Sequence, residues 1–401
     1  MIRKILFITW DGPNTTYLER LFLPIFSGLG EHGFQFHVLQ FSWATANVVE
    51  RRASECHKRG IPYANVRVSR HFGSVGPFVS ALFGARTIRH LVSKWGIDCL
   101  LPRSLMPALS VLSLRRHEQR AMSIIFDADG LAVDERVDFG KLSPHSLTYR
   151  LLRDVEAELL RRSDGVLMRT TAARSILLAR AGSALSPDAC AVISNGVDPA
   201  PFQSALGGLS VADRQGFTLC YCGSIGSQYR LSDMLETACL LKAEMPDLCF
   251  RLLSPGGQEI EHALAVAGLS EADWITWNSI PPERIPNELV RCDLGLALRE
   301  ASFSSQAVMP IKLGEYLLAG MPVIGTPGVG DTAMLEAEGV FRSAERPDLH
   351  ETIRWIREEV RPQRSELRQK SHNVGIQHFS LQQTIEQYRT ALDVASLHKL
   401  N

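Results

Sequence analysis

Residues 304–325 read SSQAVMPIKLGEYLLAGMPVIG, and several local signals coincide in this one segment. Pro310 fits the first turn of a helix, because the N–H that proline lacks has no acceptor within a helix at that position. The apolar run Val323–Gly325 predicts a buried strand after this helix. The helix N-terminus is the positive end of the helix dipole, and Lys312 adds a mobile positive charge there. The segment therefore predicts an anion site beside a sheet.

Short apolar runs alternate with helix-length amphipathic segments on both sides of this segment. The alternation predicts parallel sheets covered by helices on both faces, which is the doubly wound α/β class. Helices are expected over residues 17–31, 78–94, 147–162 and 381–397. Strands are expected over Ile5–Thr9, Phe36–Gln40, Val66–Val68, Cys99–Leu101, Ser123–Phe126, Val166–Met168, Thr218–Tyr221, Cys249–Leu253, Leu294–Leu298 and Val323–Gly325.

The length of 401 residues indicates two domains, since single cores stop growing at about 250–300 residues. Residues 198–216 are rich in Pro, Gly, Ser and Ala and show neither a helical nor a strand period, so we interpret them as a linker. Residues 1–197 and 217–401 then form one Rossmann-like domain each. The last predicted helix, 381–397, follows every strand of the second domain and is free to cross back to the first.

The net charge of zero conceals an asymmetry between the two halves. Residues 1–180 contain 25 Lys and Arg against 16 Asp and Glu, whereas the remainder contains 18 against 27. A positive half suits an acidic partner such as phospholipid head groups or a lipid-pyrophosphate acceptor. An equally good alternative is that the two halves have solvated surfaces of opposite charge, which help the halves to associate. Duplex nucleic acid usually needs a denser basic stripe, so we expect no nucleic-acid partner.

Membrane contact is a hypothesis that rests on the positive half. The amphipathic segment 147–162 and the cluster Arg103, Arg115, Arg116 and Arg120 favour contact with an anionic bilayer, with a core-packing helix as the alternative. No run reaches the ~20 apolar residues of a membrane span, and the apolar N-terminus lacks a small-residue cleavage site. We therefore expect a cytoplasmic protein, soluble or peripheral on the inner face of the membrane.

Small polar turns follow several predicted strands. Such turns let backbone N–H groups approach a phosphate, and the carboxyl ends of strands line the ligand crevices of doubly wound sheets. A glycine after a strand is more often a simple tight turn, so each turn alone is weak evidence, and none is a Walker loop or a GxGxxG motif. The turns are Asp11–Thr16, Gly223–Ser227 and Ser254–Gly257.

Residues 310–324 resemble the nucleotide-sugar-binding motif of the retaining GT-B glycosyltransferases of family four, which reads P-x-K-x-x-E-Y-L-x-x-G-x-P-V-I. Residues 195–198 resemble the interdomain N-G-V-D signature of that family, and residues 221–226 resemble its phosphate loop. Residues 126–130 with 134–135 resemble an acceptor motif, and residues 378–380 resemble the start of the closing helix. The likeness thus extends over nearly the whole chain.

The resemblance implies a GT-B fold of two facing Rossmann-like domains, with the acceptor bound by the N-terminal domain and the donor by the C-terminal one. It implies transfer of a sugar from a nucleoside-diphosphate sugar to a hydroxyl of a glycan or lipid-linked saccharide, with retention, in surface polysaccharide or glycoconjugate synthesis. Glu315 would bind the ribose hydroxyls, and Lys312 and Arg230 would stabilise the leaving diphosphate. Asp127 would orient the acceptor hydroxyl or accept its proton.

The candidate residues fall into a donor group and an acceptor group. The donor-binding candidates are Gly12, Asn14, Gly223, Ser224, Gly226, Pro310, Ile311, Lys312 and Glu315. The acceptor-side candidates are Asp11, Asp127, Asp129 and Glu135. We expect no cofactor besides the donor substrate.

Several positions depart from the family pattern and keep alternatives open. Ala307 stands where many members carry a second glutamate, Ser224 and Tyr229 replace the usual Arg and Lys of the phosphate loop, and Asp129 replaces a frequent Arg. Ala307 and Ser224 keep a non-catalytic partner protein open as an alternative, and a sugar-nucleotide epimerase remains an alternative because it can share the double-Rossmann layout. Asp127 and Asp129 also form a D-x-D pair, which holds a divalent metal in the other large glycosyltransferase fold, but we expect no metal here.

Overall fold

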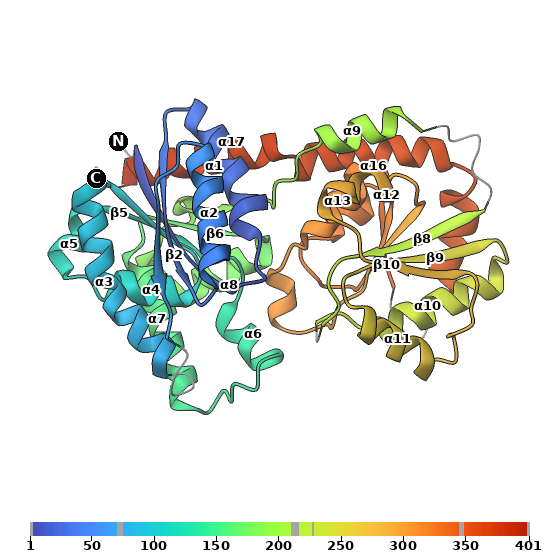
Figure 1. Cartoon of the computed structure of the whole chain (residues 1–401), viewed down its shortest axis with the longest axis horizontal. Coiled ribbons are helices and arrows are strands. Elements are labelled where there is room, and N and C mark those ends of the chain that lie inside the picture. Colours follow the sequence, from blue (N-terminus) through green and yellow to red (C-terminus); the bar gives the residue numbers. More distant parts are fainter. Residues whose placement is uncertain (1–2, 70–74, 210–215, 227, 345–348, 399–401) are drawn as a thin grey trace. The chain divides into compact units, whose positions relative to one another are not determined.

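The computed structural model of the chain describes residues 3–69, 75–209, 216–226, 228–344 and 349–398. Contacts divide the chain into two compact units, each built around one parallel sheet (Figure 1). The first unit comprises residues 1–194 and 384–401, and the second unit comprises residues 195–383. The predicted doubly wound α/β class is confirmed in both units.

The first sheet has seven parallel strands in the order β3-β2-β1-β4-β5-β6-β7. The chain places β2 and β3 on one side of β1 and then returns to place β4 on the other side. This reversal creates a topological switch point between β1 and β4, where doubly wound sheets bind ligands. The strands are β1 Lys4–Asp11, β2 Gln35–Ser42, β3 Tyr63–Arg67, β4 Cys99–Pro102, β5 Ser123–Asp127, β6 Gly165–Met168 and β7 Cys190–Val192.

The second sheet has six parallel strands in the order β10-β9-β8-β11-β12-β13. Its switch point lies between β8 and β11, which pair directly. The strands are β8 Phe217–Cys222, β9 Leu248–Leu253, β10 Ile275–Asn278, β11 Leu294–Ala297, β12 Val323–Gly325 and β13 Phe341–Ser343.

Helices connect the strands in both units (Figure 1). In the first unit they are α1 Leu23–Glu31, α2 Ala46–Lys58, α3 Val75–Trp95, α4 Leu105–Leu112, α5 Arg116–Ala121, α6 Ala132–Asp138, α7 Leu147–Arg162 and α8 Thr171–Ala181. Those that follow are α9 Ala200–Gly207, α10 Leu231–Glu244, α11 Gly257–Val266, α12 Ile285–Leu289, α13 Ile311–Leu318, α14 Ala333–Ala337, α15 His350–Trp355, α16 Arg364–Phe379 and α17 Leu381–His398.

The C-terminal helix α17 packs against the first unit. A Cβ atom at Gly28 of α1 would lie 2.2 Å from the Ile385 side chain, so glycine at this position lets the two helices approach closely. The Gln387 side chain accepts a hydrogen bond from the Ser194 backbone N–H at 2.8 Å. The chain therefore leaves the first unit after Ser194 and returns to it at Thr384.

The segment expected to lack regular structure contains a helix. Within residues 198–216, Ala200–Gly207 form α9, and Phe202 is buried in the core of the second unit. Residues 210–215 lie outside the described residues. The prediction was wrong here because Pro, Ala, Ser and Gly dominate the segment, while a single large apolar side chain anchors the helix.

The predicted elements agree with the structure most closely in the buried strands and the long helices. The helix predicted over residues 147–162 is α7 without any shift. The strand predicted at Val66–Val68 begins three residues earlier, as β3, where each residue is only partly buried or exposed. The edge strands β7, β10 and β13 were missed, because short runs of three or four residues carry little periodic signal.

Candidate active site

Helix α13 is fixed over the carboxyl ends of β8 and β11, at the switch point of the second sheet. The hydroxyl of Tyr316 in α13 accepts a hydrogen bond from the Cys222 N–H at 2.7 Å and donates to the Leu296 carbonyl at 3.2 Å. A Cβ atom at Gly295 would lie 2.5 Å from the Tyr316 ring, so glycine in β11 makes room for that ring. The helix that carries the sequence motif thus has a fixed position on the sheet.

Lys312 is buried near the start of α13, between two aromatic rings. Its side chain is 7% exposed, and its Nζ lies 4.1 Å from the ring centre of Tyr221 and 3.8 Å from that of Tyr229. Nζ also donates to the Tyr221 hydroxyl at 3.0 Å. Burial, with a smaller contribution from the nearby Arg299 guanidinium, lowers the pKa of Lys312 to about 7, against the opposing effects of Cys222 and Glu315. Lys312 is therefore a buried side chain and not a solvated one.

The glycine-rich loop after β8 lies directly beside Lys312. Gly223 has a φ of +140°, and a Cβ atom there would lie 3.1 Å from Lys312 Nζ. The Tyr221 hydroxyl donates to the Ser224 carbonyl at 2.6 Å. Because the same hydroxyl accepts from Lys312 Nζ, it links the loop to the lysine. Gly226 continues the turn by accepting from the Tyr229 N–H at 2.9 Å. Of the residues predicted for the donor, the structure thus brings together those of the Gly223 loop and of α13, whereas Gly12 and Asn14 lie in the first unit.

The start of α13 is held by the Asn195–Asp198 segment of the same unit. The Asn195 side chain donates to the Met309 carbonyl at 2.6 Å, immediately before the helix. Pro310 is the N-cap residue, and the helix begins at Ile311. Pro310 was predicted inside the first turn, so the helix begins one residue later than predicted. Glu315 follows one turn later and is partly exposed. Its carboxylate can therefore reach a ligand that lies against the helix.

Arg230 is less favourably placed than Lys312 for binding a diphosphate. It precedes α10, its side chain is 44% exposed, and its Nε lies 2.7 Å from an Asp233 oxygen and 3.3 Å from a Glu300 oxygen. Two carboxylates thus already compensate its charge. Arg299, which the sequence analysis missed, is buried at the end of β11 and lies over the Tyr229 ring at 5.1 Å. Its Nε contacts no acceptor among the described residues.

In the first unit, Asp127 forms a buried ion pair at the carboxyl edge of the sheet. Arg169, just after β6, donates from Nη2 to both Asp127 oxygens at 2.9 and 3.0 Å. Burial raises the pKa of Asp127, although Arg169 opposes that shift. Desolvation favours the neutral arginine, but Asp127 and Asp129 together still raise the pKa of Arg169. The pair is a coupled unit, and Arg169 was not foreseen from the sequence.

Asp129 is the more exposed of the two carboxylates. Its side chain is 36% exposed and pairs with Arg103, and its backbone adopts a φ of +61° while its N–H donates to Asp127 at 3.1 Å. Burial raises its pKa, but Arg103 and Arg169 outweigh that effect, so the pKa is lowered overall. The Asp127 side chain is fully buried. A side chain must be accessible to contact a substrate. The buried Asp127 carboxylate is not accessible, whereas the Asp129 carboxylate is partly exposed.

The loop after β1 is held by internal bonds. Asp11 is buried and accepts from Thr9 at 2.9 Å and from Gln40 at 2.7 Å. Arg52 of α2 is fully buried and donates to the Gly12 carbonyl at 3.0 Å. Asn14, in the same loop, is exposed. The Asp11 carboxylate is therefore bonded to side chains of its own sheet, whereas Asn14 is accessible to solvent. Both residues belong to the first unit.

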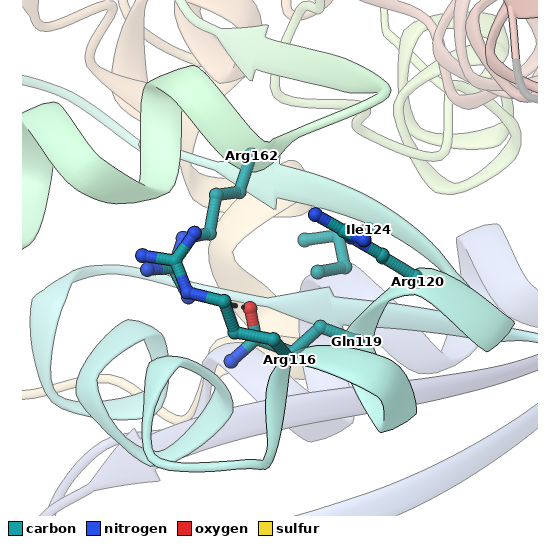
Figure 2. A pocket seen from close by; sticks show the side chains of 5 residues that line it. All are labelled: Arg116, Gln119, Arg120, Ile124 and Arg162. Carbon is teal, nitrogen blue, oxygen red and sulfur yellow. Dashed lines mark hydrogen bonds between the residues drawn. The ribbon is translucent and has the colours of Figure 1, made fainter.

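The arginine cluster proposed for membrane contact divides into two groups. Arg103 lies in the interior beside Asp129 and faces the rings of Tyr17 and Phe22, so it does not belong to a surface patch. Arg116 and Arg120 lie on α5, next to Arg162 of α7 (Figure 2). Including Arg103 in the cluster was wrong, because sequence proximity does not reveal which side chains point inward.

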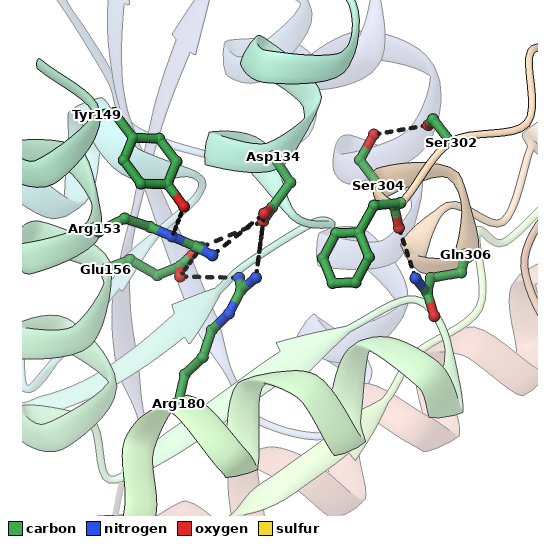
Figure 3. Close-up of polar contacts among 9 residues, drawn as sticks. Asp134, Tyr149, Arg153, Glu156, Arg180, Ser302, Ser304 and Gln306 are labelled. Carbon is green, nitrogen blue, oxygen red and sulfur yellow. Dashed lines mark hydrogen bonds and ion pairs between the residues drawn. The ribbon is translucent and has the colours of Figure 1, made fainter. Parts of the chain in front are cut away.

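The predicted acceptor residue Glu135 lies beside a buried ionic network. Glu135 is exposed on α6, whereas its neighbour Asp134 is buried. Both Arg153 and Arg180 donate to the Asp134 carboxylate at 3.0–3.3 Å, and both contact Glu156 (Figure 3). These contacts join α6, α7 and α8, so this part of the predicted acceptor motif has a structural role.

Two further features of the described residues concern metal binding and the membrane. Within the described ranges, no group of three or more His, Cys, Asp or Glu side chains is arranged to hold a metal ion. Among the same residues, none of the helices combines the length and the apolar character needed to cross a bilayer.

Sequence comparison gives one partial relative. No protein-family model matches the chain. TuaH of Bacillus subtilis (strain 168), a protein named as a teichuronic acid biosynthesis glycosyltransferase, is 29% identical over 147 residues. The match covers 36% of this chain and 34% of that protein, so the aligned region is about a third of the relative's length.

Structural comparison extends over nearly the whole chain. Anabaena HepE in complex with UDP has a TM-score of 0.67 at 15% identity, covering 97% of this chain and 99% of HepE. The lipopolysaccharide outer core galactosyltransferase WaaB has a TM-score of 0.68 at 12% identity, over 97% and 99%. Neisseria meningitidis UDP-GlcNAc 2-epimerase has a lower TM-score of 0.60 at 13% identity, over 97% and 99%. The chain therefore has the GT-B fold that its motifs predicted.

Proposed function

We propose that this protein is a glycosyltransferase that moves a sugar from a nucleoside-diphosphate sugar to a hydroxyl acceptor. The observation that carries the proposal is the position of Lys312, which is buried beside the Gly223 loop at the start of α13, at the switch point of the second sheet. An anion bound there meets the helix N-terminus, loop N–H groups and a lysine at once. The likeness to TuaH and to WaaB supports the same class of reaction.

The donor is a nucleotide sugar bound by the second unit in this proposal. Solved structures of HepE contain UDP, UDP with glucose, and UDP-glucose, which supports a nucleoside diphosphate as the shared part of the donor. Glu315 accepts hydrogen bonds from the ribose hydroxyls, one turn after the diphosphate site. Lys312 becomes fully protonated when the diphosphate binds and then stabilises the negative charge of the leaving group.

The reaction forms a bond between the acceptor oxygen and the anomeric carbon and breaks the bond between that carbon and the diphosphate oxygen. The acceptor proton leaves with the diphosphate or passes to a carboxylate. In the first unit the partly exposed Asp129 carboxylate orients the acceptor hydroxyl in this proposal, while Asp127 and Arg169 hold the Asp129 turn. We propose retention of the anomeric configuration, because the motif of residues 310–324 resembles that of retaining enzymes.

A lipid-linked or glycan acceptor is proposed together with peripheral membrane contact. Exposed apolar side chains occur on the first halves of α3 and α7, where Leu82, Phe83, Leu147 and Leu151 are each at least 47% exposed. The two helices pack against one small apolar cluster, so these side chains belong to one region of the first unit. Cosedimentation with anionic vesicles tests this contact, and retention of vesicle binding after Phe83→Ser and Leu147→Ser would contradict it.

Donor binding is the first experimental test. A screen of melting temperature against UDP-, GDP-, ADP- and CMP-sugars should give a rise for one nucleotide, since a ligand that binds only the native state stabilises it. The winning nucleotide sugar is then incubated with candidate acceptors and assayed for the transferred sugar. If no nucleotide sugar raises the melting temperature, the proposal fails.

An epimerase is the second candidate, because the Neisseria epimerase bound to UDP-GlcNAc shares the fold. An epimerase would convert its nucleotide sugar without any acceptor, whereas a transferase needs one. Donor binding without conversion or transfer would instead indicate the non-catalytic alternative suggested by Ala307 and Ser224.

A further inference from the structure

Arginine side chains surround a cavity of about 230 Å³ at the amino edge of the first sheet (Figure 2). Arg116 and Arg120 of α5, Arg162 of α7, Gln119 and Ile124 form its lining. Ile124 lies near the amino end of β5, whereas the Asp127 group lies at its carboxyl end. The cavity is therefore at the edge of the sheet opposite the proposed acceptor group.

Arg162 is held in place before any ligand arrives. Its Nη1 donates to the Gln119 amide oxygen at 2.7 Å, and its Nε donates to the Glu158 carboxylate at 2.7 Å. Gln119 is fixed in turn, since its amide nitrogen donates to the Leu112 and Leu114 carbonyls at 3.1 and 2.8 Å. With a further bond from Nη2 to Glu158, Arg162 uses three of the five N–H donors of a guanidinium. The remaining donors are available to a ligand.

Positive charge exceeds negative charge around this cavity. Arg116, Arg161 and Arg162 all contact the single carboxylate of Glu158, at 3.8 Å in the case of Arg116. Arg120 has no ion-pair partner in the part of the chain that the structure describes. Asp164 accepts from the backbone N–H of Ile124 at 2.9 Å. The arginines therefore lack enough carboxylates for neutrality.

We propose that this cavity binds a phosphate-bearing ligand, at a site separate from the donor and acceptor sites. The planar guanidinium matches the geometry of phosphate oxygens and forms paired, charge-assisted hydrogen bonds with them. A volume of about 230 Å³ is several times the share of one water molecule in the liquid, about 30 Å³, so a phosphate or pyrophosphate group fits. The ligand is either a soluble phosphate compound or the head group of an anionic lipid.

Titration with inorganic pyrophosphate tests the phosphate chemistry. The full chain carries Lys312→Met as background, so that binding at the proposed donor site does not mask the result. We expect that adding Arg116→Gln and Arg120→Gln weakens pyrophosphate binding about tenfold or more, because charge-assisted hydrogen bonds are lost. The control is Arg51→Gln, a substitution of an exposed arginine on α2, which should leave binding unchanged.

Vesicles identify the source of the phosphate. The same variants are sedimented with phosphatidylglycerol vesicles and with neutral phosphatidylcholine vesicles. Binding of pyrophosphate alone supports a soluble ligand, and arginine-dependent binding to phosphatidylglycerol vesicles supports a lipid head group. The proposal is overturned if neither probe binds. It is also overturned if both probes bind the Arg116→Gln and Arg120→Gln variant as tightly as they bind its parent. Both assays omit nucleotide sugars, so their outcome is independent of the proposed transferase activity.

Discussion

Lys312 in the second unit and Arg169 in the first are both buried cations at the carboxyl edge of a parallel sheet, yet their surroundings differ. Lys312 lies between the rings of Tyr221 and Tyr229, and its pKa is lowered to about 7. Arg169 donates to both oxygens of Asp127, and its pKa is raised. One cation has aromatic partners and the other has a carboxylate.

This difference indicates distinct roles for the two cations. A buried charge without a carboxylate costs stability, and an anionic ligand can repay that cost on binding. A buried charge that already has its carboxylate contributes to the fold, because removing one partner leaves the other unpaired. We therefore expect Lys312 to contribute to binding and Arg169 to stability.

The largest expected effect is the loss of stability in Arg169→Met. This substitution leaves the Asp127 carboxylate buried without its cation, so the free energy of unfolding should fall by about 3–5 kcal/mol. Urea denaturation measures the change. The surface substitution Arg161→Met removes an ion pair between Arg161, whose side chain is 47% exposed, and Glu158, whose side chain is 32% exposed. This substitution should lower the free energy of unfolding by less than about 1 kcal/mol. Equal losses in the two variants would contradict the comparison.

The second effect is a change of opposite sign in Lys312→Met. Donor affinity should fall about 10- to 100-fold, since charge-assisted hydrogen bonds to the diphosphate are lost. The free protein should become more stable at neutral pH, because a buried charge has been removed. Calorimetric titration and urea denaturation measure the two quantities, with Lys370→Met, an exposed lysine of α16, as control. A loss of stability without loss of affinity would assign Lys312 a structural role.

The third effect is the dependence of donor affinity on pH. Because the free-state pKa of Lys312 is about 7, affinity for a nucleotide sugar should be constant below pH 7 and fall up to about tenfold per pH unit above it. The free protein should show the reverse trend. The pKa of this lysine is lower in the folded state than its ordinary value of 10.5, so folding stability should rise between pH 7 and 10.5. Both trends should disappear in Lys312→Met.

The smallest effect is expected for Arg230→Met. Arg230 is 44% exposed and already compensated by Asp233 and Glu300, so its replacement should change stability by less than about 1 kcal/mol. Donor affinity should fall less than in Lys312→Met. A larger loss of affinity than in Lys312→Met would show that Arg230 changes partners when the donor binds.

Local signals in the sequence predicted much of the fold and the donor-side candidates. Residues 147–162 form α7 because their helical period is long and uninterrupted. Pro310, Lys312 and Gly223 were predicted as donor-binding residues from local features of the sequence. These features are the proline and the lysine of the 310–324 motif and the glycine turn after a predicted strand. The structure confirms that these residues lie together, while their role in donor binding remains our proposal.

The contacts that could not be predicted are those between residues far apart in the chain. Arg169 follows β6 and contacts Asp127 at the end of β5, 42 residues earlier. Arg299 reaches Tyr229 from the end of β11 in the same way. An arginine directly after a buried strand was the available signal for both. Choosing the partner required knowledge of strand order, which single-sequence patterns do not supply.

The structure of the protein with bound UDP tests the central claim most directly. The account predicts that the diphosphate lies at the start of α13, within hydrogen-bond distance of Lys312 Nζ and the Gly223–Ser224 backbone, with the ribose against Glu315. A UDP molecule bound elsewhere, with Lys312 still enclosed by Tyr221 and Tyr229, would contradict it.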